Sequence, residues 1–416
     1  MKVYFEVYGC TANKSDASLI LGLLKQVHYE IVNKIDCADV LIIITCTVIG
    51  TTEQRMLSRL REFKKTGKKV IVAGCMASIQ SDLIKSILPD AHLLPSQYSN
   101  YIVDIIENKE FCFPINNKKV GPKYFDGITA PISIAEGCMF ACSYCITSPA
   151  RGELSSYSVD EIVKDVCYAL NQNCKEIQLT AQDTASYGLD INNNLGNLLT
   201  NICRINGNYR IRVGMMNPYT TLLNLSSIID GFKDNKIFKF LHIPVQSGDN
   251  NILYLMNRKY TVDDFIKIIS KFKDKYPNLT LSTDIIVGFP SETDEQFNRS
   301  FDLLKIVKPD IVNITRYSSR PMTKAKIMKN RVSTKIAKER SRTLTNLCSI
   351  IARNKNSEHI GQKYKVLVTK KGKNNFFVGR AENYKPVVVN HRVEIGEFID
   401  VEIVDFDAVH LFGNLI

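Results

Sequence analysis

The chain has 416 residues, enough for two or three domains with separate hydrophobic cores. Its 45% hydrophobic and 23% charged residues are those of a globular protein and argue against a disordered or fibrous chain. The formal net charge of +12 favours a polyanionic partner, of which nucleic acid is the commonest. A basic surface that serves solubility alone is the alternative.

The amino-terminal stretch MKVYFEVYGC has no apolar run long enough for a signal peptide. The longest strongly apolar run, Val40 to Ile44, is too short to cross a membrane. We therefore expect a cytoplasmic protein with no membrane partner. Twelve cysteines in that compartment favour metal binding, catalysis or burial over a disulfide framework.

The first 110 or so residues predict strands that alternate with helices. Strands are expected over 2–8, 40–44 and 69–73, with helices over 13–26, over 51–65 and after Ser78. Such alternation is typical of a parallel sheet covered on both faces. Residues 108–131 contain three prolines and two glycines among few periodic apolar residues, and this composition predicts a linker.

The alternation resumes after this segment. Strands are predicted over 132–136, 175–180, 210–215, 238–243, 279–288 and 310–315. Helices separate them, and two begin with capping boxes, Ser158 with Glu161 and Thr293 with Gln296. Six strand–helix units predict a partial (β/α)6 barrel, short of the eight units of the closed form. A helix is predicted over 325–355.

The last 60 residues change to short strands separated by Gly, Asn and Pro, which predict a small five-stranded β-barrel. The expected fold is therefore α/β, with an N-terminal parallel α/β domain, a central partial barrel and a C-terminal β-barrel. The expected domain bounds are 1–115, 125–352 and 356–416.

Three cysteines follow the first predicted barrel strand directly, in the run EGCMFACSYC. Cys138, Cys142 and Cys145 are four and then three residues apart. Zinc prefers four nitrogen or sulfur ligands, and no fourth ligand stands at a suitable spacing. A four-iron cluster held by three thiolates keeps one iron open for a ligand that is not protein. The alternative is three buried cysteines in one loop.

Three further cysteines occupy equivalent places in the N-terminal domain. Cys10, Cys46 and Cys75 each follow one of its three predicted strands. In one parallel sheet the carboxyl ends of these strands share an edge, so we expect the three thiols to form one site. A second three-thiolate cluster is the natural interpretation, and burial in the core is the alternative.

The compact spacing, with the aromatic Tyr144 before its last cysteine, resembles the signature of radical S-adenosylmethionine (SAM) enzymes. The whole chain resembles the methylthiotransferase family. The similar segments include YGCTANKSDA, TCTV, AGC, ARGELSSY, HIPVQSGDNNILYLMNRKY and STDIIVGFPSETDEQF. LTAQDTASYG, RVGMMNP and YSSRPMTKAKIM look most like its archaeal and eukaryotic branch, and the tail resembles a TRAM domain, an RNA-binding β-barrel.

The resemblance implies a tRNA methylthiotransferase with two 4Fe–4S clusters. Its substrate would be N6-threonylcarbamoyladenosine at position 37, beside the anticodon, and its product the 2-methylthio derivative. One SAM would methylate a sulfur at the cluster of Cys10, Cys46 and Cys75. Another, at the second cluster, would yield a radical that removes hydrogen from C2 of the adenine. An electron donor such as ferredoxin or flavodoxin and a sulfur donor are also implied. The family usually has Asn where this chain has Thr45.

Polar residues at the ends of the later barrel strands are candidates for SAM binding. They are Gln182, Asp183, Gln246, Ser247, Asp284 and Gly288, and Tyr144 is expected near the adenine. Ordinary loop polarity, or packing for Tyr144, is the alternative. The six other cysteines (37, 112, 167, 174, 203 and 348) share no structural position and are predicted to be packing residues.

Basic residues before and within the C-terminal module predict contact with RNA phosphates. The candidates are Lys335, Lys338, Arg340, Arg342, Lys371 and Arg380, with the aromatic Phe377 and Tyr384 nearby to stack on bases. A solvated helix face is the alternative for any one of them.

Three rival functions remain open at this point. The same chemistry could act on isopentenyl-type adenosine or on a ribosomal protein. A non-enzymatic iron–sulfur protein that binds RNA or transfers electrons would not need the long barrel. A zinc protein would contain no iron.

Overall fold

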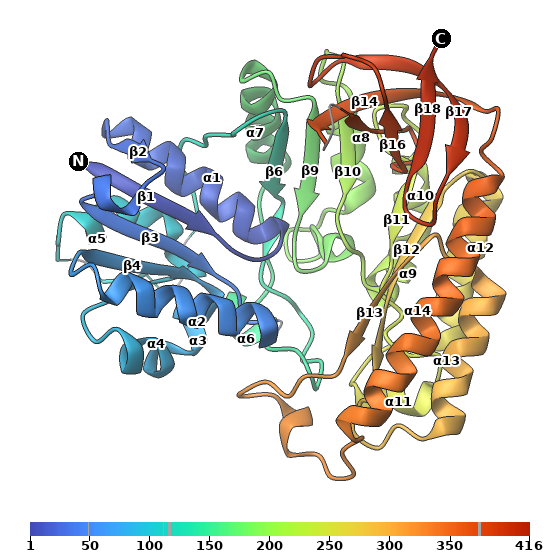
Figure 1. The fold of residues 1–416 in the computed structure, drawn as a ribbon, viewed down its shortest axis with the longest axis horizontal. Coiled ribbons are helices and arrows are strands. Elements are labelled where there is room, and N and C mark those ends of the chain that lie inside the picture. Colours follow the sequence, from blue (N-terminus) through green and yellow to red (C-terminus); the bar gives the residue numbers. More distant parts are fainter. Residues whose placement is uncertain (49, 111, 115–117, 373–375) are drawn as a thin grey trace.

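The structure is a computed structural model that describes residues 1–48, 50–110, 112–114, 118–372 and 376–416. It contains the three expected bodies: an N-terminal α/β domain, a central α/β barrel and a C-terminal β-barrel (Figure 1). Each body has its own cluster of buried apolar side chains.

The N-terminal domain is a five-stranded parallel sheet in the order β2-β1-β3-β4-β5. Its strands are β1 (Lys2–Val7), β2 (Glu30–Val32), β3 (Val40–Thr45), β4 (Lys69–Gly74) and β5 (His92–Pro95). Its helices are α1 (Thr11–Gln26), α2 (Gly50–Lys64), α3 (Cys75–Ile79), α4 (Ser81–Ile87) and α5 (Ile102–Ile106), with 3-10 turns at Ile35–Cys37 and Ser96–Tyr101. Every residue of β3 is buried because helices cover both faces of the sheet. Strands β2 and β5 are too short to stand out in the sequence.

The central domain has six parallel strands that follow one another in chain order. They form two three-stranded sheets, and a β-bridge between Ile211 and Ile237 connects the sheets. The six strands are β6 (Thr129–Ser133), β9 (Glu176–Thr180), β10 (Arg210–Val213), β11 (Phe240–His242), β12 (Thr280–Val287) and β13 (Ile311–Arg316). A hairpin of β7 (Ala135–Glu136) and β8 (Ser155–Ser156) flanks β6. The partial barrel predicted from six strand–helix units is therefore confirmed.

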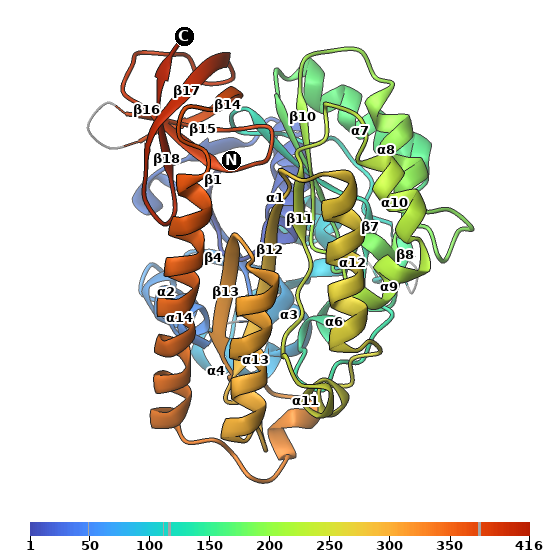
Figure 2. The ribbon, with the colours of Figure 1, turned by 90° about the vertical axis from the view of Figure 1, so that its right-hand side faces the viewer.

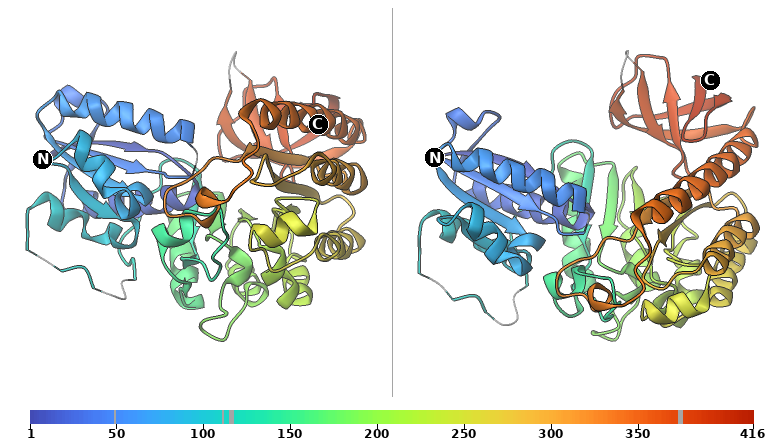
Figure 3. Two further views of the ribbon diagram at one scale, coloured as in Figure 1. Left: turned by 90° about the horizontal axis from the view of Figure 1, so that it is seen from below. Right: turned by 60° about the horizontal axis from the view of Figure 1, so that its bottom comes forward.

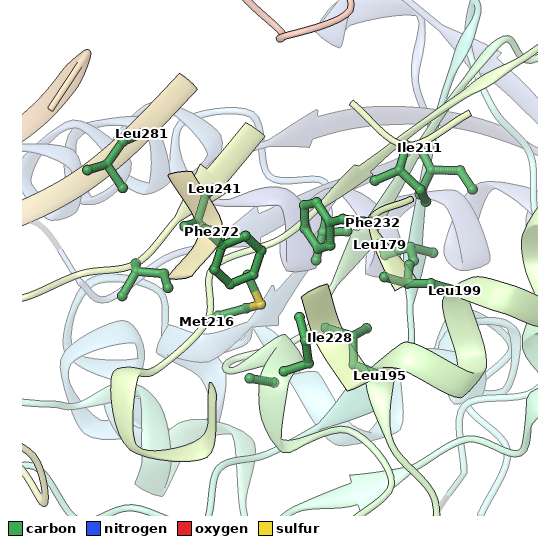
Figure 4. Packing of buried hydrophobic residues seen from close by; sticks show 14 of the residues in the cluster. Leu179, Leu195, Leu199, Ile211, Met216, Ile228, Phe232, Leu241, Phe272 and Leu281 are labelled. Carbon is green, nitrogen blue, oxygen red and sulfur yellow. The ribbon is translucent and has the colours of Figure 1, made fainter. Parts of the chain in front are cut away.

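Helices cover the outside of this barrel, and their buried faces pack against strand residues such as Leu179 and Ile211 to form the core (Figures 2 and 4). The helices are α6 (Thr147–Arg151), α7 (Val159–Asn171), α8 (Leu195–Cys203), α9 (Pro218–Leu223), α10 (Leu225–Gly231), α11 (Asn250–Leu255), α12 (Val262–Lys275), α13 (Asp294–Val307) and α14 (Thr334–Ser357), with 3-10 turns at Thr184–Ser186 and Lys324–Ile327. Both predicted capping boxes form, and a third begins α12 at Thr261.

The C-terminal module is a closed five-stranded barrel in the order β14-β15-β16-β18-β17, as predicted. Its strands are β14 (Lys363–Lys371), β15 (Phe377–Arg380), β16 (Pro386–Val389), β17 (Phe398–Phe406) and β18 (Leu411–Leu415). It packs on the start of β11 and the residues just before it: the ring centroid of Tyr384 lies 4.8 Å from that of Phe238 and 4.9 Å from that of Phe240. The module thus lies at the amino-terminal side of the barrel strands, while α14 runs from it toward the opposite side (Figure 2).

Three local predictions are corrected. Residues 111 and 115–117 of the predicted linker lie outside the described residues, but Lys119 in its described part is buried and pairs with Asp16 of α1. Pro131 lies inside β6, which tolerates it because β6 is the edge strand of its sheet. The helix predicted from residue 325 begins only at Thr334, where Ser333 caps it.

Candidate metal centres and adjoining pocket

The dispersed cysteines lie at the carboxyl ends of three adjacent strands. Thr45 at the end of β3 pairs with Gly74 at the end of β4, so Cys46 and Cys75 follow these two strands at the same level. Cys10 follows β1, the other neighbour of β3 in the sheet. Cys46 and Cys75 are buried and Cys10 is exposed. Burial raises the pKa of both buried thiols, and the proximity of Cys10 raises it further.

Glycines let these loops approach closely. Gly9 has a φ of 111°, and a Cβ there would lie 2.9 Å from the Cβ of Cys46. Gly74 has a φ of 91°, and its Cβ would lie 2.6 Å from the carbonyl oxygen of Thr45. Asn13 then ties the loops together, because its Nδ2 donates to the carbonyls of Tyr8 (2.7 Å) and Thr45 (2.9 Å). Any larger residue before Cys10 or Cys75 would force the thiols apart.

The compact cysteines lie in the loop that leaves β7 toward α6, and all three are half-buried. Burial raises the pKa of Cys138 to about 12. Burial also raises the pKa of Cys142, but Arg258 opposes this rise, since its Nη1 lies 3.3 Å from that sulfur. The neighbouring Asn257 donates to the carbonyl of Ala141 at 2.8 Å. The sequence analysis missed Arg258, whose only signal was its place in the segment HIPVQSGDNNILYLMNRKY.

A buried ionic network joins the two cysteine sets. Arg151, six residues after Cys145, donates to Asp16 (2.7 Å), Asn13 (2.7 Å) and Glu136 (3.1 Å). Lys119 pairs with Asp16 and, at 2.6 Å, with Glu136. Burial raises the pKa of Glu136, but Lys119 and Arg151 outweigh it and bring the value to about 2. The network therefore fixes the loop of the compact set against the strand ends that carry the dispersed set.

The thiol sets have the donor chemistry of iron–sulfur ligands. No three Cys, His, Asp or Glu side chains in the described residues converge on a point where a single ion would sit. A four-iron cluster spreads its thiolates over different irons, so its ligands need not converge on one point. Exposed Cys37 and Cys112 contradict their predicted packing role, while Cys174 and Cys203 are buried as predicted.

A pocket of about 240 Å³ lies beside the compact set, between the barrel and the N-terminal domain. Three of the predicted SAM residues, Tyr144, Gln246 and Asp284, line it together with Cys145. Val48, two residues after Cys46, lines it from the N-terminal domain. The structure therefore brings this part of the predicted site together at the domain boundary.

The other predicted SAM residues do not line this pocket. Asp183 is buried and accepts from Thr220 (2.6 Å) and from two backbone N–H groups, and burial raises its pKa to about 6. Ser247 is buried and accepts from the N–H of Asp249 at 3.2 Å. A Cβ on Gly288 would lie 2.7 Å from the Cβ of Ala337, so this glycine lets α14 pack on the end of β12. Gln182 has a buried Oε1 without a partner among the described residues.

The candidate RNA-binding residues divide into two groups. Lys335, Lys338, Arg342 and Lys371 are exposed, and half-buried Arg380 lies over the ring of Tyr384 at 4.5 Å. Arg340 is buried and pairs with Glu292 (2.6 Å) and Asp294 (2.8 Å), so its prediction as a phosphate contact is wrong. Tyr384 packs the β-module onto the barrel, and its hydroxyl donates to Glu176 at 2.8 Å, which leaves it unsuited to stack on bases.

Comparisons with known proteins match each part of the chain. Residues 132–304 match the Radical SAM superfamily, 358–416 the TRAM domain and 2–94 a family described as Uncharacterized protein family UPF0004. In the described part of the chain, no helix has the length and apolar character needed to cross a bilayer.

Two curated relatives align over the whole chain. A "Probable threonylcarbamoyladenosine tRNA methylthiotransferase" of Archaeoglobus fulgidus is 40% identical, over 100% of this chain and 99% of its own length. "Ribosomal protein uS12 methylthiotransferase RimO" of Clostridioides difficile is 31% identical, over 100% and 99%. Among solved structures, the radical S-adenosylmethionine methyltransferase TsrM of Kitasatospora setae has a TM-score of 0.57 at 12% identity, over 78% of this chain and 77% of TsrM. This last likeness concerns the fold alone.

Proposed function

Because this chain belongs to the methylthiotransferase family, we propose that it transfers a methylthio group to C2 of N6-threonylcarbamoyladenosine at position 37 of tRNA. The chain is a transferase with a radical SAM domain. Identity of 40% to a relative named for the tRNA reaction, against 31% to one named for a ribosomal protein, supports the nucleoside as substrate. The single observation that carries the proposal is the pocket bordered by Cys145 and by Val48 beside Cys46.

We assign one 4Fe–4S cluster to Cys138, Cys142 and Cys145, and a second to Cys10, Cys46 and Cys75. Three thiols at each place fit a four-iron cluster with one iron free for an outside ligand. The first cluster with SAM would supply the one-electron chemistry that an unactivated aromatic C–H requires. The side chains of the protein stabilise a cluster ligand and line the binding space. Arg258 stabilises the Cys142 thiolate. Tyr144, Gln246 and Asp284 line the space for SAM and the base.

The tRNA would lie along α14. This helix of 24 residues is about 36 Å long at 1.5 Å per residue, and it connects the pocket side of the barrel with the β-module. Exposed Lys335, Lys338 and Arg342 lie on its first half. Lys371 and Arg380 would extend the contact onto the TRAM domain. Ferredoxin or flavodoxin as electron donor, an unspecified sulfur donor and a cytoplasmic location belong to the same proposal.

Iron and sulfide counting on anaerobically reconstituted protein tests the two clusters. Replacing Cys138, Cys142 and Cys145 by alanine should remove about half of the iron, and so should replacing Cys10, Cys46 and Cys75. The exposed pair Cys37→Ala and Cys112→Ala is the matched control and should retain all of it. Loss of all the iron or of none from a triple variant contradicts the assignment. A zinc protein would show no iron absorbance in any of them.

Nucleoside analysis of tRNA tests the reaction. Cells that lack the gene should lose 2-methylthio-N6-threonylcarbamoyladenosine, and the wild-type gene should restore it. An unchanged level of this nucleoside rejects the proposed substrate. Loss of a methylthiolated isopentenyl-type adenosine or ribosomal protein would support those substrates instead. Reduced protein that forms no deoxyadenosine from SAM would indicate a non-enzymatic protein.

A further inference from the structure

The segment that follows β13 forms one wall of the pocket and reaches the N-terminal domain (Figure 3). Tyr317 and Arg320 from this segment line the pocket, together with Arg316 at the end of β13. A Cβ added at Gly50, the first residue of α2, would lie 3.8 Å from Nη1 of Arg320. The wall is therefore close to the loop that follows Cys46.

Two of the charged groups in this pocket already have polar partners. Arg320 is 6% exposed, forms an ion pair with Glu53 and donates to Thr47 at 3.3 Å. Asp284 has His242 at 3.0 Å and accepts from Asn313 at 2.7 Å. The ion pair with Glu53 compensates the charge of Arg320, whereas the partners of Asp284 hydrogen-bond its carboxylate.

Arg316 is different. It is exposed at the end of β13, and the described residues provide no ion pair or side-chain hydrogen bond for its guanidinium. Its guanidinium is thus a cation of the pocket wall with no partner among the described residues, and a guanidinium of this kind suits an oxyanion.

Two neighbouring polar atoms also lack partners. Nε of Arg320 and the hydroxyl of Tyr317 are buried, and neither has a hydrogen-bond partner of ordinary geometry among the described residues. Buried donors are almost always paired in native proteins, and an unpaired one costs free energy. Both atoms belong to residues that line the same pocket as Arg316.

We propose that Arg316, supported by Nε of Arg320 and the hydroxyl of Tyr317, binds the carboxylate of the threonylcarbamoyl group. The inference rests on the proposed function. The threonyl moiety ends in a carboxylate, whereas unmodified adenosine has no anion on its base and an isopentenyl group is apolar. A guanidinium with a planar array of donors suits a carboxylate. Arg316 therefore makes the enzyme act after the reaction that attaches threonylcarbamate to the adenosine.

The test compares two forms of one tRNA, with threonylcarbamoyladenosine or with plain adenosine at position 37, on reconstituted full-length protein. Wild-type protein should bind the modified form more tightly. Arg316→Gln should lose about 10- to 100-fold of that preference, the range for a charged hydrogen bond, while its affinity for the plain form and for SAM stays unchanged. Arg316→Lys should restore part of the preference. Arg204→Gln, at an exposed arginine after α8, is the matched control.

Other sources of an oxyanion give other results. Equal weakening of both tRNAs by Arg316→Gln would indicate a backbone phosphate and overturn the proposal. Weaker SAM binding with an intact preference would indicate the carboxylate of SAM, with the same consequence. If the wild type methylthiolates the modified tRNA but Arg316→Gln keeps the full preference for that tRNA, only the inference about Arg316 is rejected. A wild type that methylthiolates neither tRNA rejects the proposed function as well.

Discussion

Arg151 and Asp16 form a buried ion pair with a 2.7 Å hydrogen bond, although they are 135 residues apart and belong to different domains. Arg151 follows the compact cysteines, and Asp16 lies on α1, which begins directly after Cys10. The same guanidinium reaches Asn13, which holds the strand-end loops together. The pair thus helps to set the distance between the two cysteine sets. Its removal should weaken the interface between the two domains more than the hydrophobic core of either domain.

Arg151→Gln should lower the free energy of unfolding by about 3–5 kcal/mol, because it leaves buried Asp16 and Glu136 with Lys119 as their shared cation. Urea titration measures this change. Lys305→Gln is the control, since its pair with Asp302 has side chains 56% and 64% exposed, and about 1 kcal/mol or less is expected there. A small, equal effect of both substitutions would show that the network does not hold the domains.

Arg258→Gln should raise the pKa of the Cys142 thiol. Burial already raises that pKa, and Arg258 is the cation that opposes the rise at 3.3 Å from the sulfur. In metal-free protein the rate of Cys142 alkylation should therefore reach its midpoint at higher pH in the variant, as measured by mass spectrometry of the modified peptide. Alkylation of exposed Cys37 in the same sample provides the internal control. An unchanged midpoint for Cys142 would remove Arg258 from the account of this site.

The cysteine positions show how much the sequence could predict. Alternation of strands and helices requires a parallel sheet, and a parallel sheet places Cys10, Cys46 and Cys75 at one edge. Arg258 could not be found in this way, because its contact with Cys142 joins loops 116 residues apart. The same holds for Arg151 with Asp16. These partners depend on how whole units pack, which local patterns do not encode.

Arg340 shows a prediction that failed despite a usable signal. Ala337, Arg340 and Leu344 are three and four residues apart and lie on the buried face of α14. The helical period therefore separated Arg340 from its exposed neighbours, but the high positive charge of the segment favoured RNA binding for all of them. Its partner Glu292, 48 residues earlier, could not be identified from sequence spacing.

His359 should make the join between α14 and the β-module sensitive to acid. It is buried, with Nδ1 2.5 Å from the hydroxyl of Tyr364, and burial followed by the nearby Lys385 lowers its pKa to about 4. The unfolded chain, with an ordinary histidine pKa of about 6.5, binds a proton that the folded chain excludes. The contribution of neutral His359 to the free energy of unfolding is therefore fully present above about pH 6.5, and it is lost as the pH falls toward 4.

His359→Gln should remove this contribution. Between pH 7 and pH 5 the thermal midpoint of the variant should fall less than that of the wild type, and scanning calorimetry at both values measures the difference. His391→Gln, at an exposed histidine of the same module, should follow the wild type. Identical pH dependence in the wild type and His359→Gln would show that carboxyl groups alone determine the acid response.

Replacing Lys335, Lys338 and Arg342 together by alanine should weaken tRNA binding and reduce its salt dependence. The three side chains are exposed on one part of α14, where binding to phosphates would release counterions. The slope of log K against log salt should become shallower by about 0.7–0.9 for each phosphate that is no longer neutralised, hence by about 2–3 in total. A filter-binding titration at several salt concentrations measures it.

Lys267, Lys271 and Lys275 on α12 provide a charge-matched control, since replacing all three by alanine changes the net charge by the same amount. Their removal should leave the slope nearly unchanged, because long-range attraction between exposed charges is screened beyond about 10 Å at 0.1 M salt. Equal changes in the two triple variants would mean that overall charge, and not a defined surface on α14, attracts the tRNA. Arg340→Gln should lower the thermal midpoint without a change in slope, because its guanidinium pairs with Glu292 inside the fold.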